Sequence, residues 1–336
     1  MNENRKALLG FIVLVIIGIV MLIFLPKKNP SLVRKTRLVL DTYVSISVES
    51  DQNADKAINA AFERMKQIEK KLNRYDPKSE VSKINRTAPN SVKVSDETYK
   101  AMELGLQYSK KTNGYFDITV GPLVNLFNFN KRVVPSKTQV NRVKQLVDWR
   151  DVKLNKTGRT VALAKKGMIL DLGGLAKGFA ADEAYKVLKR YKVRTVLIDT
   201  GSSTLAFSPK GGRVWRVGLK HPRSDEMLGV FKVQKANLST SGDYQQYFIK
   251  SGRRYHHIIN PIIGYPAKGL VSVTINSKKT AAESDILSTA VFSLGPTKGL
   301  ELIKSLSGTE AVLIDSAGKI RVTNSKLITL PAKINL

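Results

Sequence analysis

An uninterrupted apolar segment near the start of this 336-residue chain is its most constraining feature. Residues 7–25 read ALLGFIVLVIIGIVMLIFL and contain no charged side chain, and basic pairs flank them, Arg5 with Lys6 before and Lys27 with Lys28 after. As a helix, a segment of this length spans roughly 28 Å, close to the thickness of a bilayer's hydrocarbon core. A buried helix of a globular domain is rarely apolar on every face. The segment therefore predicts a transmembrane helix.

The residues around this helix bear on its cleavage and orientation. Phe24-Leu25-Pro26-Lys27 is a poor signal-peptidase site, so we expect an uncleaved signal anchor. More basic residues follow the helix than precede it, which by the positive-inside rule favours a cytoplasmic body. Long domains, however, translocate largely regardless of charge. We divide the chain into residues 1–31, a short cytoplasmic tail, anchor and linker, and residues 32–336, one body long enough for a buried core.

The body is strongly basic and contains no cysteine. The chain carries 56 Lys and Arg against 27 Asp and Glu, a formal net charge of +29. Such a field attracts nucleic acid, anionic lipid and anionic cell wall alike. No nucleic-acid-binding signature accompanies it, so nucleic acid is not an expected partner and a solvated basic surface is the favoured interpretation. The lack of cysteine excludes disulfides, thiolate catalysis, cysteine-ligated zinc and a lipoprotein anchor.

Helices and short strands follow one another in the body without strict alternation. Apolar spacing favours helices over residues 54–72, 96–112, 136–146, 175–190, 281–293 and 297–305. Strands are expected over residues 37–48, 152–154, 160–163, 168–170, 195–199, 215–219, 229–233, 255–259, 271–275, 311–314 and 320–323. This order favours the α+β class, a mixed α/β arrangement of sheets with flanking helices.

The chain lacks the common nucleotide-binding motifs. There is neither a G-x-G-x-x-G after a strand nor a G-x-x-x-x-G-K-[ST], which disfavours Rossmann hydride transfer and P-loop phosphoryl transfer. Residues 171–178, DLGGLAKG, form a glycine-rich junction between a strand and a helix. Its backbone amides would receive a phosphate at the helix N-terminus, with Lys177 as a counter-charge. The alternative is that the glycines serve only a tight turn.

Two further groups of residues are candidates for chemistry. Asp285, Ser288 and Thr289 lie three and four positions apart on one helix face, and their oxygens suit Mg²⁺ better than zinc. Alternatively, Asp285 stabilises the helix N-terminus and the hydroxyls bond to the helix backbone. His256 and His257 end a strand before a turn, where a histidine serves as an acid or base or is simply packed and hydrogen-bonded.

Loop residues supply the last candidates. Residues 240–244, TSGDY, are expected to form a small-residue turn between strands. Tyr75, Tyr115 and Phe116 are large aromatic residues in expected loops. They stack either on a planar ring ligand or on the core of the body.

Taken together and in this order, these segments resemble the FAD:protein FMN transferase family, also called the ApbE family. The matching segments are LDTYVSISV at 40–48, LNRYDPKSEVSKIN at 72–85, TNGYFDITVGPLVNLFNF at 112–129, LDLGGLAKGFAAD at 170–182, STSGDYQQYF at 239–248, HHIINPIIGYP at 256–266 and ESDILSTAVFSLG at 283–295. The resemblance extends over nearly all of residues 38–305. It implies an ApbE-like, T-fold-type arrangement of mixed sheets and makes residues 32–336 the catalytic domain.

The resemblance also implies a set of site residues. FAD, as the substrate, would contact Leu40, Tyr75, Tyr115, Phe116, Asp117, Lys177, Glu183 and the backbone near Ile259. Mg²⁺ would be held by the main-chain oxygen of Ala180 with Asp285, Ser288 and Thr289, and would bridge the FAD pyrophosphate. His257 would be the acid or base near the reacting phosphate, with Asp285 as the other proton acceptor. Asn260, Ile262 and Ile263 depart from the family's acid, arginine and threonine in one loop.

The implied reaction is covalent flavinylation, in which FMN passes from FAD to a threonine of an acceptor protein and AMP is released. The implied acceptor is an exported or membrane redox flavoprotein that carries a threonine flavinylation motif. Such an acceptor favours a single-pass protein of the cell membrane with an extracytoplasmic catalytic domain. Three alternatives remain: an FAD pyrophosphatase giving FMN and AMP, a non-catalytic flavin-binding protein, and a basic surface adhesin.

Overall fold

The computed structural model describes residues 31–50, 53–127, 129–324, 326 and 328–336. The expected transmembrane anchor, residues 7–25, lies outside these residues. None of the helices in the described ranges is long and apolar enough to cross a membrane. The prediction of an anchor is therefore untested by the structure.

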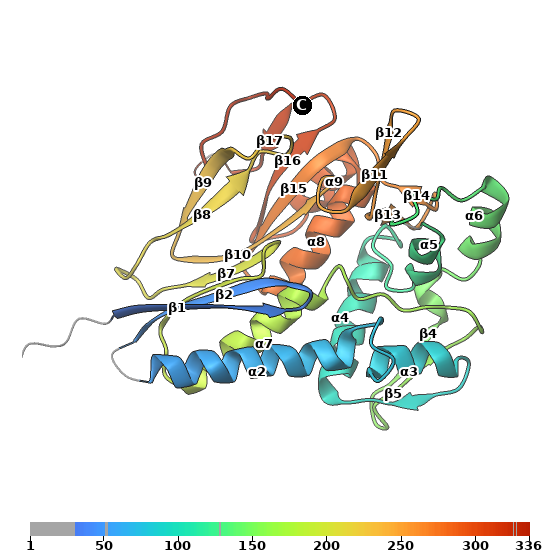
Figure 1. The fold of residues 1–336 in the computed structure, drawn as a ribbon, viewed down its shortest axis with the longest axis horizontal. Helices are drawn as coiled ribbons and strands as arrows, with labels where there is room; N and C mark the ends of the chain where they lie inside the picture. The colour runs from blue at the N-terminus through green and yellow to red at the C-terminus, as the bar shows by residue number, and fades with distance from the viewer. Residues whose placement is uncertain (1–30, 51–52, 128, 325, 327) are drawn as a thin grey trace, which may run out of the picture.

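An eight-stranded sheet forms the centre of the fold (Figure 1). Each neighbouring pair in it is antiparallel. In spatial order its strands are β1 (Ser31–Val39), β2 (Thr42–Ser50), β6 (Thr195–Asp199), β7 (Ser203–Phe207), β10 (Lys235–Gly242), β15 (Leu270–Ser277), β16 (Thr309–Asp315) and β17 (Ile320–Val322). Segments far apart in sequence thus lie side by side across the sheet.

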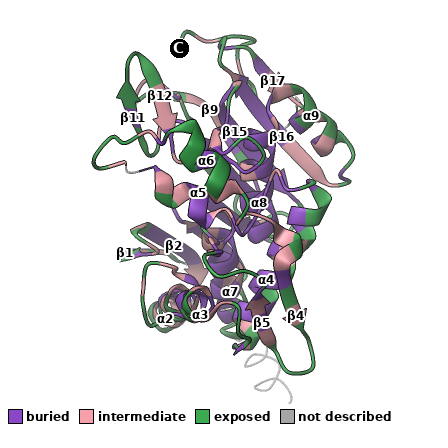
Figure 2. Ribbon diagram, turned by 90° about the vertical axis from the view of Figure 1, so that its right-hand side faces the viewer, coloured by how far each residue is buried: buried purple, intermediate pink, exposed green. Residues whose placement is uncertain are grey.

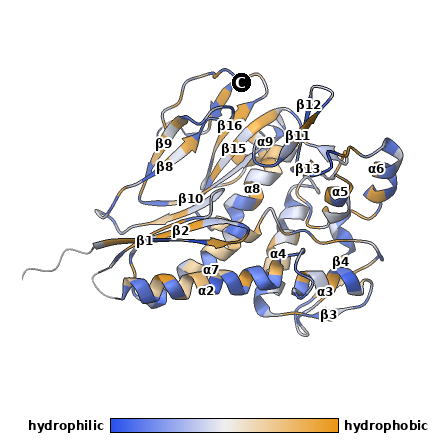
Figure 3. Cartoon of the chain, in the orientation of Figure 1, coloured by the Kyte–Doolittle hydropathy of each residue, from blue (hydrophilic) through white to orange (hydrophobic). Residues whose placement is uncertain are grey.

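Long helices cover one face of this sheet. They are α2 (Ala54–Leu72), α7 (Ala176–Arg190) and α8 (Ala281–Leu294), with α9 (Pro296–Lys304) following α8. Figure 3 shows α2 as largely polar on its outer side, as expected for a helix that buries one apolar stripe. The buried residues Phe62, Met65 and Ile68 lie on that stripe and belong to the main core.

A second core lies on the other face of the sheet. The hairpin of β8 (Trp215–Lys220) and β9 (Met227–Val233) and the C-terminal segment cover this face. Alternation along β16 places Ala311 and Leu313 in the main core and Val312 and Ile314 in the second. Successive strand residues point to opposite faces. Both faces of the central strands are therefore buried, and both need apolar side chains.

Smaller elements complete the end of the molecule where the cleft described below opens. They are α3 (Glu80–Thr87), β3 (Val92–Lys93), α4 (Asp96–Lys111), α5 (Gly121–Leu126), α6 (Lys137–Lys144), η1 (Trp149–Asp151), β4 (Val152–Asn155), β5 (Thr160–Leu163), β11 (Tyr247–Lys250), β12 (Arg253–His256), β13 (Ile259–Asn260) and β14 (Tyr265–Pro266). A third apolar cluster around Leu123, Phe127, Val140 and Ile259 holds several of them together.

The α+β class is confirmed, but some predicted elements are wrong. The strand predicted over 37–48 is a hairpin, because Leu40 and Asp41 adopt φ of 59° and 55° in the tight turn between β1 and β2. The strand predicted over 168–170 is reduced to one bridge, between Val120 and Ile169. Most of the turn predicted at 240–244 is instead the end of β10. The strands β3, β7, β10, β11 and β14 and the helices α3 and α5 were not predicted.

Candidate active site

A cleft of about 810 Å³ opens between the N-terminal end of α7, strand β10, the β1–β2 turn and the segment after β12. Ten of the residues expected from the sequence line it: Leu40, Tyr75, Tyr115, Phe116, Asp117, Lys177, His257, Ile259, Asp285 and Thr289. Segments separated by more than 200 residues therefore meet at one site. Its volume is in the range of pockets that bind ligands of nucleotide size.

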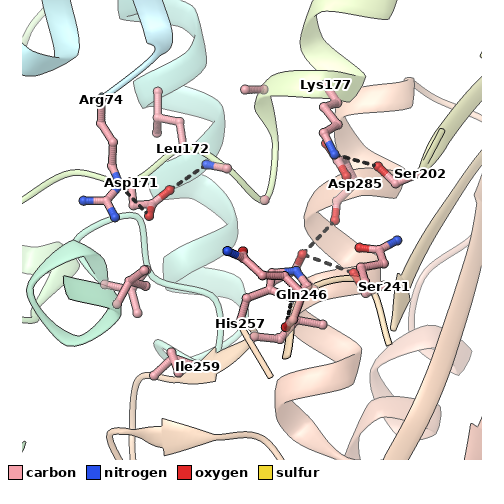
Figure 4. A pocket seen from close by; sticks show the side chains of 18 of the residues that line it. Arg74, Asp171, Leu172, Lys177, Ser202, Ser241, Gln246, His257, Ile259 and Asp285 are labelled. Carbon is pink, nitrogen blue, oxygen red and sulfur yellow. Dashed lines mark hydrogen bonds and ion pairs between the residues drawn. The ribbon is translucent and has the colours of Figure 1, made fainter. Parts of the chain in front are cut away.

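Asp285 lies at the base of this cleft, in the second turn of α8, and is 6% exposed. Its carboxylate accepts hydrogen bonds from the hydroxyls of Ser203 and Ser239, at 3.2 and 3.0 Å, and from the backbone N–H of Gly178 at 3.1 Å. Burial raises the pKa of Asp285, while the Gly178 amide and the positive charge of Lys177 oppose that rise. The ammonium of Lys177 itself bonds to Ser202 at 3.3 Å (Figure 4).

Further hydroxyls surround this carboxylate. Ser241, on β10, lies 2.8 Å from the hydroxyl of Ser288 and 3.4 Å from that of Thr289. Thr289 lines the cleft, whereas Ser288 is fully buried behind it. Both side chains also bond to the main-chain oxygen of Asp285, as expected for hydroxyls in a helix. The structure thus brings together all three side chains of the expected magnesium site.

These groups fit a hard divalent cation. No group of three or more His, Asp or Glu side chains suited to a metal occurs in the described ranges, so a cation here would rely on one carboxylate with hydroxyl and main-chain oxygens. Asp285 has no ion pair with Lys or Arg among the described residues, so a bound cation would offset the cost of burying its charged form. Oxygen donors of this kind suit Mg²⁺.

The main-chain ligand expected from Ala180 does not fit this geometry. Ala180 is fully buried in the main core and does not line the cleft. Gly174 does line it, and a Cβ added to Gly174 would lie 3.1 Å from the hydroxyl oxygen of Thr289. The backbone at Gly174, ahead of α7, therefore approaches the hydroxyl oxygen of Thr289 at the cleft.

Glu183 is also not at the cleft. Its carboxylate pairs with Arg64 of α2 and with Lys186, at 2.5 Å for the latter, on the far side of α7. Glu183 comes five positions after Gly178 on α7, and this spacing places it on the side of the helix that faces α2, away from α8. Its observed partners give it a role in holding α2 against α7.

His257 lies beside the cleft, directly after β12. Its backbone N–H donates to the carbonyl of Gln246 at 3.0 Å, and its Nδ1 lies 3.3 Å from the same oxygen. A carbonyl only accepts hydrogen bonds, so Nδ1 carries the proton and Nε2 remains a free acceptor. Burial lowers the pKa of His257 to about 4, and the charge of Lys177 adds to this effect. The imidazole is therefore neutral near pH 7.

The neighbouring His256 is a packed residue. It is 4% exposed, its Nε2 lies 3.0 Å from the carbonyl oxygen of Ala267, and its ring contacts that of Phe292. Alternation along β12 thus separates the two histidines, one toward the core and one toward the cleft.

An ion pair not expected from the sequence forms the opposite wall. Arg74 and Asp171 pair at 2.8 Å (Figure 4). The Arg74 guanidinium lies over the ring of Tyr75, 4.3 Å from its centroid. Tyr75 remains 70% exposed, so its ring is available to stack on a planar ligand. Both charged residues lie within segments that resemble the ApbE family. This resemblance was the only feature of the sequence that pointed to a role for them in the site.

Asp117 and Phe116 shape the cleft from within. Asp117 accepts hydrogen bonds from the backbone of Thr119 and of Trp149, at 2.8 and 3.1 Å. Burial raises its pKa to about 6 despite these bonds. Phe116 is 5% exposed and packs near Gly174, whereas Tyr115 is partly exposed beside Lys298. Asp117 therefore fixes the turn that presents the aromatic residues.

Asn260 serves the turn in which the chain departs from the family pattern. Its side-chain oxygen accepts from the backbone N–H groups of Ile262 and Ile263, at 2.9 and 3.2 Å. Its amide nitrogen donates to the carbonyl of Ser293 at 2.9 Å. An ionised carboxylate could make only the first two bonds, because it has no donor. The asparagine thus ties this turn to α8, and it leaves Ile262 and Ile263 exposed.

Comparison with known proteins gives a consistent result. The model of the ApbE family matches residues 40–313. A FAD:protein FMN transferase of Treponema pallidum is 31% identical over 312 residues, covering 86% of each chain. A FAD:protein FMN transferase of Klebsiella pneumoniae is 31% identical over 267 residues, 77% of this chain and 83% of that one.

Solved structures agree. The crystal structure of the ApbE protein of Thermotoga maritima superposes with a TM-score of 0.82 at 30% identity, covering 88% of this chain and 98% of the other. The apo form of the Pseudomonas stutzeri flavinyl transferase ApbE gives 0.79 at 26% identity, covering 90% and 98%. The family model spans both walls of the cleft, and the fold agrees over nearly its full length. The chain belongs to the ApbE family.

Proposed function

We propose that this protein is an FAD:protein FMN transferase, which moves FMN from FAD to a threonine hydroxyl of an acceptor protein. The ApbE family model matches both walls of the cleft, and relatives that carry this name align with most of the chain. The observation that carries the proposal is the pairing of a buried carboxylate among hydroxyls, at Asp285, with a neutral histidine at His257, in one cleft. A phosphoryl-transfer site needs this combination of charge neutralisation and proton acceptance.

Asp285, Ser288, Thr289 and the backbone at Gly174 would hold Mg²⁺, which would neutralise charge on the FAD pyrophosphate. Lys177 adds positive charge from the N-terminal turn of α7. On the opposite wall, the ring of Tyr75, held by Arg74, stacks on a planar ring of the dinucleotide. The residues of the cleft thus divide between binding the pyrophosphate and binding the rings.

The chemical step is a substitution at the phosphorus of the FMN half. The threonine oxygen forms a bond to this phosphorus, and the bond from phosphorus to the bridging oxygen breaks, so AMP leaves with that oxygen. The threonine proton passes to Nε2 of His257, because Nδ1 is occupied by the Gln246 carbonyl. The acceptor proposed is a redox flavoprotein, and water in its place would give FMN and AMP.

The test is flavin transfer to protein. The full chain, kept in a non-ionic detergent, is incubated with FAD, Mg²⁺ and an acceptor domain bearing a threonine flavinylation motif. We expect a fluorescent acceptor band on a denaturing gel that is absent with EDTA and absent for Asp285→Ala. The matched control is Asp225→Ala, which removes a fully exposed carboxylate outside the cleft.

Two outcomes contradict the transferase. Free FMN and AMP without a labelled acceptor would identify an FAD pyrophosphatase. A full band for Asp285→Ala in the presence of EDTA would remove the magnesium site from the proposal.

We also propose that residues 7–25 anchor the protein in the cell membrane with the catalytic domain outside the cytoplasm. The support is the uncharged apolar segment and its flanking basic pairs. Protease added to intact cells should digest the catalytic domain, because the proposed orientation exposes it outside the cell. A domain that stays intact in this experiment would be cytoplasmic and would contradict the orientation.

A further inference from the structure

Two long segments of the chain contain no acidic residue. Residues 118–147 and 244–282 include neither Asp nor Glu, although the whole chain has 27 of them. Both segments carry several basic residues: Lys131, Arg132, Lys137, Arg142 and Lys144 in the first, and Lys250, Arg253, Arg254, Lys268, Lys278 and Lys279 in the second. Their positive charge therefore has no compensation within the segments themselves.

The fold brings these two segments together at the mouth of the cleft. The ring of Phe129 contacts that of Phe248 on β11, with centroids 5.7 Å apart. The ammonium of Lys144 on α6 bonds to the main-chain oxygen of Ile262 at 2.6 Å. Figure 2 shows α6 and β11 largely exposed and facing the same side of the molecule. The segments thus form one continuous surface.

We call this surface the rim: the exposed residues Arg132, Tyr247, Ile249, Lys250, Arg253, Ile262 and Ile263. Its apolar members are large and open to solvent, with Ile249 55% and Ile263 45% exposed. Within the described ranges, Arg132, Lys250 and Arg253 take part in no ion pair, and Arg253 instead lies over the ring of Tyr255. Exposed apolar residues among unpaired cations are typical of a surface that binds a partner.

We infer that the rim binds an acidic, partly apolar segment of the acceptor protein, next to the threonine that receives the flavin. This inference rests on the proposed transferase function. Its basis is charge complementarity: a surface with cations and no carboxylates attracts an acidic partner and repels a basic one. The apolar side chains would then bury matching apolar groups of the same segment.

The position of the rim favours a protein as the partner. Gln246, immediately before β11, and His257, immediately after β12, both line the cleft. A chain lying along this hairpin therefore leads from the rim to the proposed proton acceptor. A docked acceptor segment is placed so that its neighbouring hydroxyl enters the cleft.

The test measures binding without turnover. Two fluorescein-labelled, threonine-containing peptides of equal length are used, one with four Asp or Glu residues beside the threonine and one with Asn or Gln in their place. Binding to the full chain in non-ionic detergent is followed by fluorescence anisotropy at low salt. We expect the acidic peptide to bind at least about fivefold more tightly, and added salt to remove the difference.

The variant that tests the rim is Arg132→Gln with Lys250→Gln and Arg253→Gln. It should weaken binding of the acidic peptide about tenfold. The matched control replaces three exposed lysines outside the cleft and the rim, Lys153→Gln with Lys156→Gln and Lys210→Gln, and should bind like the wild type. A further variant, Ile249→Ser, should weaken both peptides if the apolar contact is used.

Three outcomes would overturn the inference. The wild type could bind both peptides equally, or the rim and control variants could lose equal affinity for the acidic peptide. In the third outcome, the rim variant binds the peptide normally but no longer binds phosphatidylserine vesicles. The last would make the rim a lipid-binding surface. FAD binding, followed by flavin fluorescence, should be the same in all variants. A failure of flavin transfer with normal peptide binding would instead count against the proposed function alone.

Discussion

His257 shows how a neighbouring main-chain group prepares a side chain for its role. The carbonyl of Gln246 accepts a hydrogen bond from the Nδ1–H of His257, so the imidazole presents Nε2 as an acceptor to the cleft. Burial and the nearby Lys177 then keep the ring neutral. Orientation and protonation state are thus both set before any substrate binds.

A pH prediction follows for His257, whose pKa is lowered from 6.5 to about 4. Because the neutral form is the base, protonation of His257 should not limit transfer between pH 8 and 5.5, and the rate should fall as the pH approaches 4. The same shift makes the folded state lose stability as the pH falls from 6.5 to 4, since the unfolded chain binds the proton first.

His257→Gln should lower kcat by about 10²- to 10⁴-fold with little change in the KM for FAD. Single-turnover transfer measured against pH checks both statements. A wild-type rate that falls already at pH 6.5, with the fall absent in His257→Gln, would show that the ring titrates near its ordinary pKa.

Gly174 supports a second prediction at this scale. A Cβ at this position would lie 3.0 Å from the ring of Phe116 and 3.1 Å from the hydroxyl of Thr289. Gly174→Ala should therefore displace the backbone from the proposed cation site and weaken Mg²⁺ binding.

Thermal unfolding in a Mg²⁺ titration measures this effect without turnover. The wild type should gain about 2.7 kcal/mol at a Mg²⁺ concentration one hundred times its Kd. Gly174→Ala should need a higher concentration for the same gain. The control Gly158→Ala, in an open turn where the nearest atom is 3.5 Å away, should follow the wild type.

Among the elements, the crossing of α7 and α8 determines the geometry of the site. At Gly178 a Cβ would collide with the carbonyl of Ala281 and lie 2.7 Å from the nitrogen of Ala282. One turn along α7, Asp182 accepts the backbone N–H groups of Ala281 and Ala282, each at 2.9 Å, and so caps α8. The same close approach lets the Gly178 N–H reach Asp285.

Gly178→Ala should therefore destabilise the protein by about 2–3 kcal/mol, because the two helix backbones must separate. Denaturant unfolding checks the change in the free energy of unfolding. The variant should also bind Mg²⁺ more weakly, since Asp285 loses its amide donor. Unchanged stability would mean that α7 and α8 move apart at no cost.

The elements also show which parts of this fold could be predicted. The boundaries of α2 and, to within a residue, α4 and α8 follow from apolar spacing and capping residues. Strands β7 and β10 were missed because they are rich in serine and threonine rather than β-branched apolar residues. Hydroxyls from these two strands surround Asp285. The residues that the site requires are therefore not the apolar β-branched residues from which a strand is predicted.

The site was predictable as a set of segments and less so residue by residue. Asp285, Ser288 and Thr289 meet as predicted, because positions three and four apart share a helix face. Ala180 and Glu183 do not line the cleft, because position within a matching segment does not say which side of α7 faces it. The Arg74–Asp171 pair joins residues 97 positions apart, and no local pattern reveals such a contact.

On the scale of the whole molecule, the two cores have separate tasks. The main core supports the helices that carry the cleft, and the second, around Phe231 and Trp215, closes the opposite face of the sheet. Phe231→Ala should cost about 3–5 kcal/mol of stability. It should leave FAD affinity unchanged, because Phe231 does not line the cleft.

Thermal unfolding and flavin titration of the same preparation check this separation. Met227→Ala, on the same strand at a position 66% exposed, is the control and should change neither quantity. An FAD affinity that falls in step with stability would show that the two faces of the sheet are coupled.

The hairpin of β1 and β2 sets the reach of the protein. A single nine-residue strand, about 30 Å long, joins Ser31 to the turn at Leu40 in the cleft wall. This strand is therefore a stiff spacer between Ser31 and the cleft. If residues 7–25 are the anchor that we propose, residues 26–30 and this strand together limit how far above the bilayer the cleft can lie. A threonine held well beyond that distance on a membrane-bound acceptor would be out of range, whatever its sequence.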